Sequence, residues 1–405
     1  MRILLSEGSG LTSRQVAGRL GELGHEVEIL SSTALCLTRF TRHVRAVHRV
    51  PRFGRDPFGW CDAAARIARE RGVDLLFPTQ EQVTILAARR DRLGVATVVP
   101  DFAAVRRVQD KISAFRTLDA IGVPQPPTVV VARSEDLARV TAFPAFVKLP
   151  VSTASSGVRR VTTATELTSA ARALGLGATE LIVQTGAEGP LAMVQAVADR
   201  GRLVAHHANL RVREGVGGGA ALKESVALDG LRDLLARLTG ALGWHGGLSL
   251  DVIVTAEGLR VIDVNPRLVE PANAWASGVD LVGAMLALAR GAVPVEQAQG
   301  RAGVRTRQTL LAVLGAAEHG GTRHAVLREA HDAILARGVY AGSREELTPV
   351  AGDPLAATPV ALALIMSLAH PRLWRWFHTG TVDTYAVSPQ GWQAIVAEAE
   401  RDQAA

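Results

Sequence analysis

The stretch LSLDVIVTAEGLRVIDVNPR, residues 248–267, decides the fold. Two runs rich in Val, Ile and Leu flank a turn-forming segment at residues 255–258, which predicts a β-hairpin. A three-residue loop at 256–258, with its glycine left-handed, sets Asp251 directly opposite Asp263. Because side chains alternate along a strand, Asn265 shares the face of Asp263. Three oxygen ligands are therefore predicted to converge.

Facing carboxylates destabilise a hairpin unless a cation neutralises them, and a hard divalent cation does so well. The sequence thus predicts a magnesium site formed by Asp251, Asp263 and Asn265. The alternative is a solvated hairpin face on which two aspartates happen to align. The Asn265-Pro266-Arg267 sequence that ends the hairpin favours the metal site.

Length and composition indicate a globular protein of two or three domains. The chain has 405 residues, of which 48% are hydrophobic. Two cysteines in this length exclude a disulfide framework. The apolar runs are too short for a signal peptide or a membrane span, which predicts a cytoplasmic protein without a membrane partner. A net charge of +6 and 4% aromatic residues do not favour nucleic-acid binding.

Residues 1–108 alternate strand and helix signals, which predicts βαβ units with a parallel sheet. Strands are expected at 2–6, 26–30, 73–77 and 96–99, and helices at 12–23, 62–71 and 81–93. The Gly8-Ser9-Gly10 turn lacks the third glycine of a dinucleotide fingerprint, so an ordinary tight turn is favoured.

A basic segment follows the second predicted strand. Spacings of three, three and four would gather its first four arginines on one helical face. Such a face could bind an anion such as a carboxylate, a phosphopantetheine carrier, coenzyme A or nucleic acid, and a solvated basic segment is the equal alternative. The arginines are Arg39, Arg42, Arg45, Arg49, Arg52 and Arg55.

The next region combines a helix after Asp110-Lys111 with a strand that carries Lys148 among apolar residues. The strand runs into a small, hydroxyl-rich loop at 152–158. Backbone N–H groups and hydroxyls of such a loop can enclose phosphate oxygens while the lysine neutralises them. Further on, three consecutive glycines at 217–219 suggest close approach to a ligand, with a flexible turn as the alternative.

Together these motifs resemble the ATP-grasp superfamily, in particular its carboxylate-amine ligases, among them the carbamoyl-phosphate-synthase-like and D-alanine:D-alanine-ligase-like members. The resemblance covers roughly residues 1–300. It implies an α/β fold, α+β within the ATP-grasp lobes. The implied domains are a Rossmann-like pre-ATP-grasp domain at 1–108, a lobe with the phosphate loop at 109–186, a lobe with the metal-binding hairpin at 187–300, and a C-terminal extension at 301–405.

The resemblance also implies roles for individual residues. Lys111 and Lys148 would hold the ATP phosphates, and Arg267 would steady the transferred phosphate. Arg213 and Lys223 would serve the acceptor or γ-phosphate side. The remaining nucleotide contacts would come from the loop and from the hinge between the lobes, namely Ser152, Ser155, Ser156, Gly157, Val158, Gln184, Thr185, Ala187 and Glu188.

Two positions depart from the family pattern. Asp263 stands where a glutamate is usual, which shortens the second metal ligand by one methylene. Thr185 and Leu191 stand where acidic residues usually contact the ribose, and Glu188 is the substitute that the sequence offers.

The implied reaction uses ATP and Mg²⁺, with Mn²⁺ able to substitute. A small carboxylate attacks the γ-phosphate, and an amine then displaces phosphate from the acyl phosphate. Either substrate could be carrier-bound, and a homodimer is left open. One alternative is an ATP-grasp carboxylase or kinase that forms carboxyphosphate or a phosphate ester. Another is a nucleotide-binding regulatory protein whose basic segment binds nucleic acid.

Beyond residue 300 the sequence predicts helices near 323–337 and 357–369. They are followed by an aromatic and arginine-rich cluster at 371–377. Packing of this extension onto the ligase body is favoured over a partner-binding surface.

Overall fold

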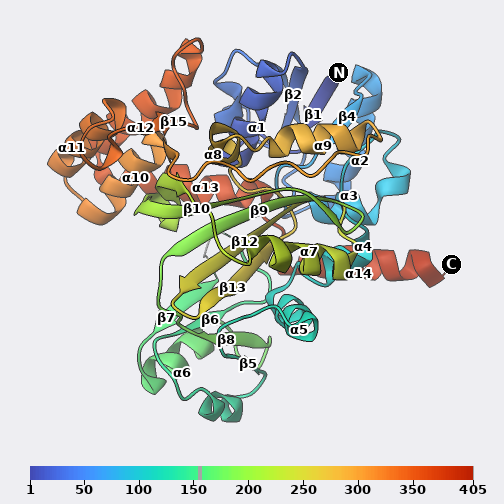
Figure 1. Cartoon of the computed structure of the whole chain (residues 1–405), viewed down its shortest axis with the longest axis vertical. Helices are drawn as coiled ribbons and strands as arrows, with labels where there is room; N and C mark the ends of the chain where they lie inside the picture. The colour runs from blue at the N-terminus through green and yellow to red at the C-terminus, as the bar shows by residue number, and fades with distance from the viewer. Residues whose placement is uncertain (154–156, 405) are drawn as a thin grey trace.

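The computed structural model describes residues 1–153 and 157–404, and its strands form three sheets (Figure 1). The N-terminal sheet is parallel, and its strand order is β3-β2-β1-β4. Its short apolar strands are covered by helices, as parallel strands require. The strands are β1 (Arg2–Leu5), β2 (Glu26–Ser31), β3 (Val44–Arg49) and β4 (Leu75–Phe77).

The helices of this region are α1 (Leu11–Glu22), α2 (Pro57–Arg71), α3 (Val83–Ala88) and α4 (Phe102–Arg106). Helix α1 begins at Leu11, one residue before the predicted start, and the side chains of Thr12 and Ser13 are buried within it. Helix α2 begins five residues earlier than predicted, where Asp56 accepts a hydrogen bond from Gly59 N at 2.8 Å. The strand predicted at 96–99 is reduced to a bridge between Leu75 and Ala96.

The basic segment is not the predicted helix. Its centre forms β3, the edge strand of the parallel sheet, because Val44, Ala46 and Val47 pair with β2. All six arginines are exposed. A charged edge of this kind resists pairing with another chain.

The second sheet is antiparallel, in the order β5-β8-β6-β7. Helix α5 (Lys111–Ile121) precedes it; Asp110 caps this helix, and Gly122 ends it in the left-handed conformation with φ 73°. The sheet elements are β5 (Thr128–Val131), β6 (Ala145–Lys148), β7 (Val158–Val161), α6 (Ala164–Ala173) and β8 (Leu181–Thr185).

The large sheet has seven strands, in the order β13-β12-β9-β10-β11-β14-β15. Helix α7 (Leu231–Leu242) buries its leucines against one face. Helices α8 (Ala272–Ser277) and α9 (Leu281–Ala289) contact the sheet as well. The strands are β9 (Leu191–Asp199), β10 (Arg202–Glu214), β11 (Ala220–Ser225), β12 (Gly246–Thr255), β13 (Gly258–Asn265), β14 (Arg305–Arg307) and β15 (Arg344–Glu345).

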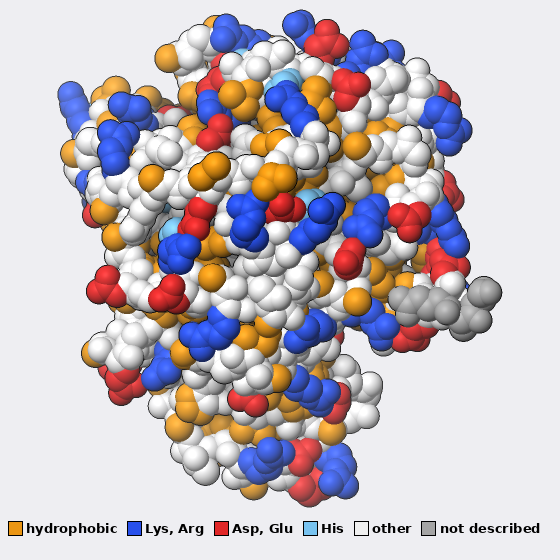
Figure 2. Space-filling model, turned by 45° about the vertical axis from the view of Figure 1, so that its right-hand side comes forward, with side chains coloured by type: hydrophobic (Ala, Val, Ile, Leu, Met, Phe, Trp, Pro, Cys, Tyr) orange, Lys and Arg blue, Asp and Glu red, His pale blue; other side chains and the backbone are white. Residues whose placement is uncertain are grey.

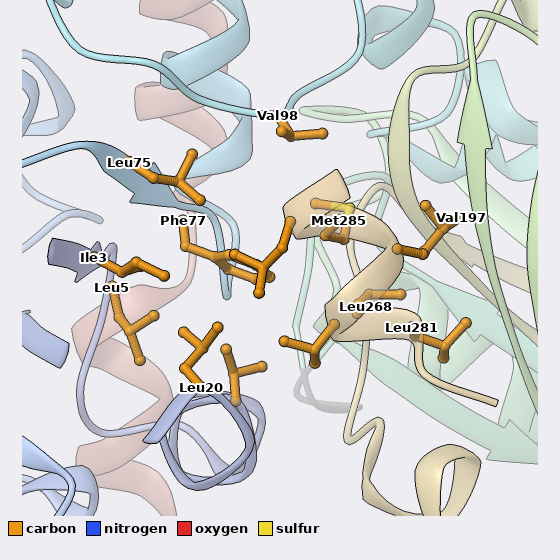
Figure 3. Close-up of a cluster of buried hydrophobic side chains, with 14 of the residues drawn as sticks. Ile3, Leu5, Leu20, Leu75, Phe77, Val98, Val197, Leu268, Leu281 and Met285 are labelled. Atoms are coloured by element: carbon orange, nitrogen blue, oxygen red, sulfur yellow. The ribbon is translucent and has the colours of Figure 1, made fainter. Parts of the chain in front are cut away.

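A hydrophobic cluster joins the N-terminal sheet to the large sheet (Figure 3). Ile3, Leu5 and Phe77 lie on one side of it, and Met285 and Leu281 of α9 lie on the other. Each of these side chains is at most 2% exposed, so burial of about 25 cal/mol per Å² holds the two sheets together.

The central hairpin has the predicted aspartate pairing but a different turn. Thr255 pairs with Gly258, so the loop has two residues rather than three. A register shift between Asp251 and Val252 then moves the pairing by one residue and sets Asp251 opposite Asp263. The predicted aspartate pair is confirmed, but a bulge produces it rather than the loop.

The C-terminal extension is part of the same body, since β14 and β15 lengthen the large sheet. Its helices are α10 (Thr309–Gly320), α11 (Arg323–Ile334), α12 (Ala357–Ala369), α13 (Trp374–Tyr385) and α14 (Pro389–Ala404). Helix α14 returns to the N-terminal region, where Glu398 pairs with Arg89 at 2.8 Å. Of the glycines at 217–219, Gly217 and Gly218 have positive φ angles of 62° and 79°, and a Cβ at Gly219 would lie 2.9 Å from Leu311 of α10.

Short 3-10 turns connect these elements: η1 (Leu37–Arg39), η2 (Arg90–Arg92), η3 (Ser134–Arg139), η4 (Val216–Gly218), η5 (Gly338–Tyr340), η6 (Pro354–Ala356) and η7 (Pro371–Leu373). Among the described residues no helix is long and apolar enough to cross a membrane. Positive and negative side chains are interspersed on the face drawn in Figure 2.

Candidate active site

The hairpin presents two carboxylates and an amide oxygen to one patch. Burial, and secondarily the charge of Asp263, raises the pKa of Asp251 to about 6. A carboxylate pair that resists ionisation suits a divalent cation, which would neutralise both groups. Asn265 Oδ1 already accepts a hydrogen bond from Arg267 Nη1 at 2.8 Å. No group of three or more His, Cys, Asp and Glu side chains suited to a metal occurs in the described parts of the chain, so the candidate site depends on the amide.

Lys148, the last residue of β6, lies beside this patch. It is 8% exposed, and Nζ donates to Gln184 Oε1 at 2.8 Å and to Ile262 O at 2.9 Å. Burial lowers its pKa, and the charge of Asp263 opposes that effect. A buried ammonium held by neutral acceptors keeps positive charge available for an anionic ligand.

Lys111 stands at the first position of α5 and connects the hairpin to the predicted phosphate loop. Its Nζ lies 3.7 Å from Asp263 Oδ1 and donates to Ser152 O at 3.2 Å. The two lysines predicted from sequence therefore both approach the hairpin acids, although they are 37 residues apart in the chain.

The described ends of the predicted phosphate loop adjoin Lys148. Val158 pairs with Lys148 across β6 and β7, and Gly157 is packed against Ser152. Ser152 Oγ is buried without a hydrogen-bond partner among the described residues, a hydroxyl that a phosphate oxygen would satisfy. The predicted contacts Ser155 and Ser156 lie outside the described residues.

A cleft opens between α5, the second sheet and β13. Its polar wall holds Lys111, Lys148, Gln184 and Asp263. An apolar wall opposite one charged end suits a heterocycle that carries phosphates. The apolar side chains are Ala114, Phe115, Leu118, Ile182, Ile262 and Val264.

The predicted hinge connects the two lobes. Strand β8 ends at Thr185, and residues 186–190 pass to β9 of the large sheet. Ala187 is half-buried and Glu188 is exposed on this connector. Gly189 lies so close to β12 that a Cβ there would be 2.1 Å from Val254 O, so the connector is fixed at this glycine.

Arg267 lies between the hairpin and the N-terminal sheet. It is 8% exposed. Besides the contact with Asn265, Nε donates to Gln80 Oε1 at 3.1 Å and Nη2 lies 3.8 Å from Glu81 Oε1. Its position between the metal patch and the end of β4 suits an arginine that holds a group in transfer.

Lys223 forms a second buried charge cluster. It is fully buried, and Nζ lies 2.6 Å from Glu270 and 2.7 Å from Glu346. Burial by itself lowers the pKa of Lys223, but the two carboxylate charges outweigh it and raise the pKa. Gln308 Nε2 also donates to Glu270. With two carboxylates around one ammonium, the cluster has a net negative charge when both are ionised and can accept a proton.

Arg213 lies elsewhere. Its guanidinium pairs with Glu329 of α11 at 2.5 Å and is 43% exposed. The role predicted for Arg213 on the acceptor side has no support in these contacts, because the partner belongs to the C-terminal extension.

Sequence reasoning missed several buried acids of this region. Glu7 and Glu81 follow β1 and β4 and are 3% and 5% exposed. A usable signal existed, because ligands in α/β sheets bind beyond the carboxyl ends of the strands. Glu270 lies only three residues after Arg267. Glu346 gave no sequence signal, because it comes from an irregular segment 76 residues later.

Comparisons with known proteins identify the architecture. No family model matches the sequence, and no curated protein matches it. The biotin carboxylase domain of Hydrogenobacter thermophilus 2-oxoglutarate carboxylase, solved with MgADP, ADP and bicarbonate, superposes with a TM-score of 0.61 at 17% identity, covering 75% of this chain and 73% of that chain. The chain has the ATP-grasp fold.

Two further ATP-grasp structures agree. N5-carboxyaminoimidazole ribonucleotide synthetase from Thermus thermophilus gives a TM-score of 0.58 at 22% identity, covering 75% of this chain and 81% of that one. Carboxyaminoimidazole ribonucleotide synthase from Aspergillus clavatus, complexed with ATP, gives 0.61 at 15% identity, covering 76% and 81%. The predicted fold class is thereby confirmed, whereas the residue roles remain predictions.

Proposed function

We propose that this protein is an ATP- and Mg²⁺-dependent ligase that activates a small carboxylate as an acyl phosphate and joins it to an amine. The observation that carries the proposal is the approach of Lys111 and Lys148 to the facing pair Asp251 and Asp263. Two lysines beside two carboxylates at the end of an apolar cleft suit a nucleotide with its metal. The bound ATP, ADP and MgADP of the structurally similar enzymes support the same cofactors.

Each group has a role in this proposal. Asp251, Asp263 and Asn265 would hold Mg²⁺, which supplies charge neutralisation and orientation of the phosphates when bound. Lys148 and Lys111 neutralise the phosphates that remain outside the metal shell. Arg267 binds the transferred phosphoryl group. Phosphoryl transfer depends mainly on such positioning and charge neutralisation.

Lys223 and Glu270 have a proposed role on the carboxylate side. Lys223 is paired with both Glu270 and Glu346, so in this proposal a substrate carboxylate would replace one of these two partners at the ammonium. The acceptor amine then attacks the acyl carbon. We propose small-molecule substrates, with a carrier-bound substrate as an extension of the same chemistry.

The second candidate is a carboxylase that activates bicarbonate as carboxyphosphate. It is favoured by the bicarbonate bound in the Hydrogenobacter structure. Lys223 and Glu270 would suit bicarbonate as well as a larger carboxylate. ADP release that depends on bicarbonate and needs no amine would select this candidate.

The test is a hydroxylamine trap. The chain is incubated with Mg-ATP, hydroxylamine and each of the twenty amino acids or bicarbonate in turn, and hydroxamate and ADP are measured. We expect hydroxamate with at least one carboxylate, in amounts equal to the ADP released. ADP release that no carboxylate changes, without hydroxamate, would contradict the ligase proposal.

A further inference from the structure

The basic segment, residues 39–55, accounts for the whole net charge of the protein. It contains six arginines and no Lys, Asp or Glu. The full chain has 45 Lys and Arg residues against 39 Asp and Glu residues, a net charge of +6, so the chain outside the segment is balanced. The positive excess is therefore concentrated in one stretch and not spread over the surface.

The charge of the segment is not compensated within the described part of the chain. All six arginines are exposed, and none of them forms an ion pair with a carboxylate there. Arg66 of the following helix, in contrast, pairs with Glu70 at 3.1 Å. The side chain of Arg39 donates to Ala34 O at 3.3 Å, which is a neutral acceptor. The guanidinium groups are consequently accessible to an anionic partner.

Protection of the sheet edge does not account for this charge. Charged side chains on an edge strand deter pairing with a second copy of the same chain. Arg45 and Arg49 lie on β3 and can serve this purpose. Arg42 precedes the strand, and Arg52 and Arg55 follow it. These flanking arginines lie where there is no strand edge to protect, so a further reason for them is needed.

The segment begins beside the proposed active site. Just before it, Thr38 N donates at 2.8 Å to Gly8 O, in the turn after β1. In the same turn Gly10 packs against Gln80, since a Cβ at Gly10 would lie 2.2 Å from Gln80 Nε2. Gln80 Oε1 in turn accepts a hydrogen bond from Arg267 Nε. A partner bound at this end of the segment therefore lies at the end of the sheet that contacts Arg267.

The shape of this edge favours a polypeptide over a nucleic-acid duplex. Helices α1 and α2 pack on the two faces of the parallel sheet, so β3 is the edge of a three-layer structure. Each helix is about 10 Å across, which makes the edge wider than a major groove of about 12 Å. The segment therefore cannot enter the groove to read bases.

The side chains around the arginines favour the same class of partner. Base stacking requires exposed aromatic rings, but Phe53 is fully buried and Phe40 is half-buried. Leu35, next to the Ala34 carbonyl that Arg39 contacts, is 75% exposed. An exposed leucine beside arginines suits a partner that has apolar side chains among its acids.

We propose that the basic segment docks an acidic segment of a protein partner, which has carboxylates interspersed with apolar side chains. A guanidinium binds a carboxylate through two parallel hydrogen bonds, and the six arginines engage several carboxylates at once. Charge complementarity of this kind accelerates association and selects the partner, and it weakens as salt increases. The inference goes beyond the ligase function and does not require it, because docking involves no turnover.

The test measures binding by fluorescence anisotropy on the full chain, without ATP, at about 0.15 M salt. The probe is a fluorescein-labelled dodecapeptide of the repeated unit Glu-Glu-Leu. The parent chain should bind this peptide, more weakly as salt is raised, and should not bind the matched peptide of the unit Gln-Gln-Leu. Single-stranded and double-stranded DNA with the same number of charges test the nucleic-acid alternative and should bind more weakly than the acidic peptide.

A combined variant locates the surface. Arg42→Gln, Arg45→Gln and Arg49→Gln together should weaken binding of the acidic peptide about tenfold, because three exposed ion pairs are lost. The melting temperature should match that of the parent, since all three side chains are exposed. If the combined variant melts lower, the pair Arg49→Gln and Arg52→Gln is measured in its place.

The matched control removes the same charge from elsewhere. It combines Arg69→Gln, Arg172→Gln and Arg337→Gln, which are exposed positions outside the segment. Its affinity for the acidic peptide should stay within about twofold of the parent, because screening limits the effect of distant charges.

Three results would overturn the inference. They are equal binding of the acidic peptide by the segment variant and the parent, an equal loss in the segment variant and the control, and DNA binding that is tighter than peptide binding and is lost in the segment variant. The hydroxylamine trap is a separate measurement, so failure of the docking inference and failure of the ligase proposal are distinguishable.

Discussion

The facing aspartates of the hairpin can be tested by Asp263→Asn, which keeps the shape of the side chain and removes one charge. In the metal-free protein, the rise in the pKa of Asp251 from 3.8 to about 6 corresponds to about 3 kcal/mol against its charged form. Burial is the larger cause and Asp263 the second. The variant should therefore recover only part of this energy.

The pH dependence follows from the same shift. Between about pH 4 and pH 6 the folded state keeps a proton on Asp251 that the unfolded state has lost. The contribution of Asp251 to the free energy of unfolding of the metal-free protein therefore falls as the pH rises through that window, and it stays lower at pH 7. Asp263→Asn should flatten this fall, because it lowers the pKa of Asp251 toward its usual range.

The assay combines thermal unfolding in EDTA and in Mg²⁺ with hydroxamate formation. In EDTA at pH 7 the variant should melt no lower than the parent, and about 1 °C higher if about 1 kcal/mol is recovered. Mg²⁺ should raise the melting temperature of the parent but not of the variant. Turnover should fall at least about 100-fold. Asp233→Asn, on the exposed face of α7, is the matched control.

One result would refute the reasoning. If Asp263→Asn melts well below the parent in EDTA while Asp233→Asn does not, the pair is a structural element of the hairpin and the metal site is wrong. Loss of activity alone would not rescue the interpretation, because an unfolded variant is also inactive.

Other residues give further predictions. Burial lowers the pKa of His207 to about 4, so between pH 6.5 and pH 4 only the unfolded state gains this proton. The free energy of unfolding should therefore fall by about 3 kcal/mol as the pH falls through this window. Urea unfolding should show that this loss disappears in His207→Asn and persists in the control His324→Gln. Arg213→Ala should cost about 1 kcal/mol or less and leave turnover within about twofold, since its ion pair is partly exposed; a large loss of kcat would restore its sequence-predicted role. Lys223→Met should lower the free energy of unfolding by about 3–5 kcal/mol in a denaturant titration, because it leaves two buried carboxylates without a cation. Adding Glu346→Gln to this variant should restore part of the lost stability. Lys148→Met should keep the fold but weaken ATP binding at least about tenfold by calorimetry, and unchanged affinity would exclude this lysine from the site.

Local sequence patterns were sufficient to predict most of the fold and the pairing of the hairpin aspartates. Strand alternation fixes which hairpin residues share a face, so Asp251 and Asp263 could be paired without any knowledge of distant contacts. The turn itself could not be predicted from the sequence, because a two-residue loop with a bulge and a three-residue loop both set Asp251 opposite Asp263. Lys148 could also be predicted from a local pattern, because it lies in an apolar strand that precedes a hydroxyl-rich loop.

The basic segment shows how two periodicities can compete. Arginines three and four residues apart satisfy a helical face, yet the apolar residues between them pair with β2 and the segment becomes an edge strand. Pairing with β2 favours the strand over the helix, and no local sequence pattern shows which strand will lie beside this segment. Glu7 and Glu81 were missed on similar grounds, since their contacts with Thr384 and Val387 depend on the order of the strands and on the return of the C-terminal helix.

Arg267 connects the hairpin to the end of the N-terminal sheet. Its guanidinium donates to Asn265 on the metal side, while Nε and Nη2 reach Gln80 and Glu81 on the side of the N-terminal sheet. A planar guanidinium with five donors can keep these contacts and still direct charge toward a group between them. In the proposed reaction, a phosphoryl group held by Arg267 would lie between Asn265 of the hairpin and Glu81 at the end of β4.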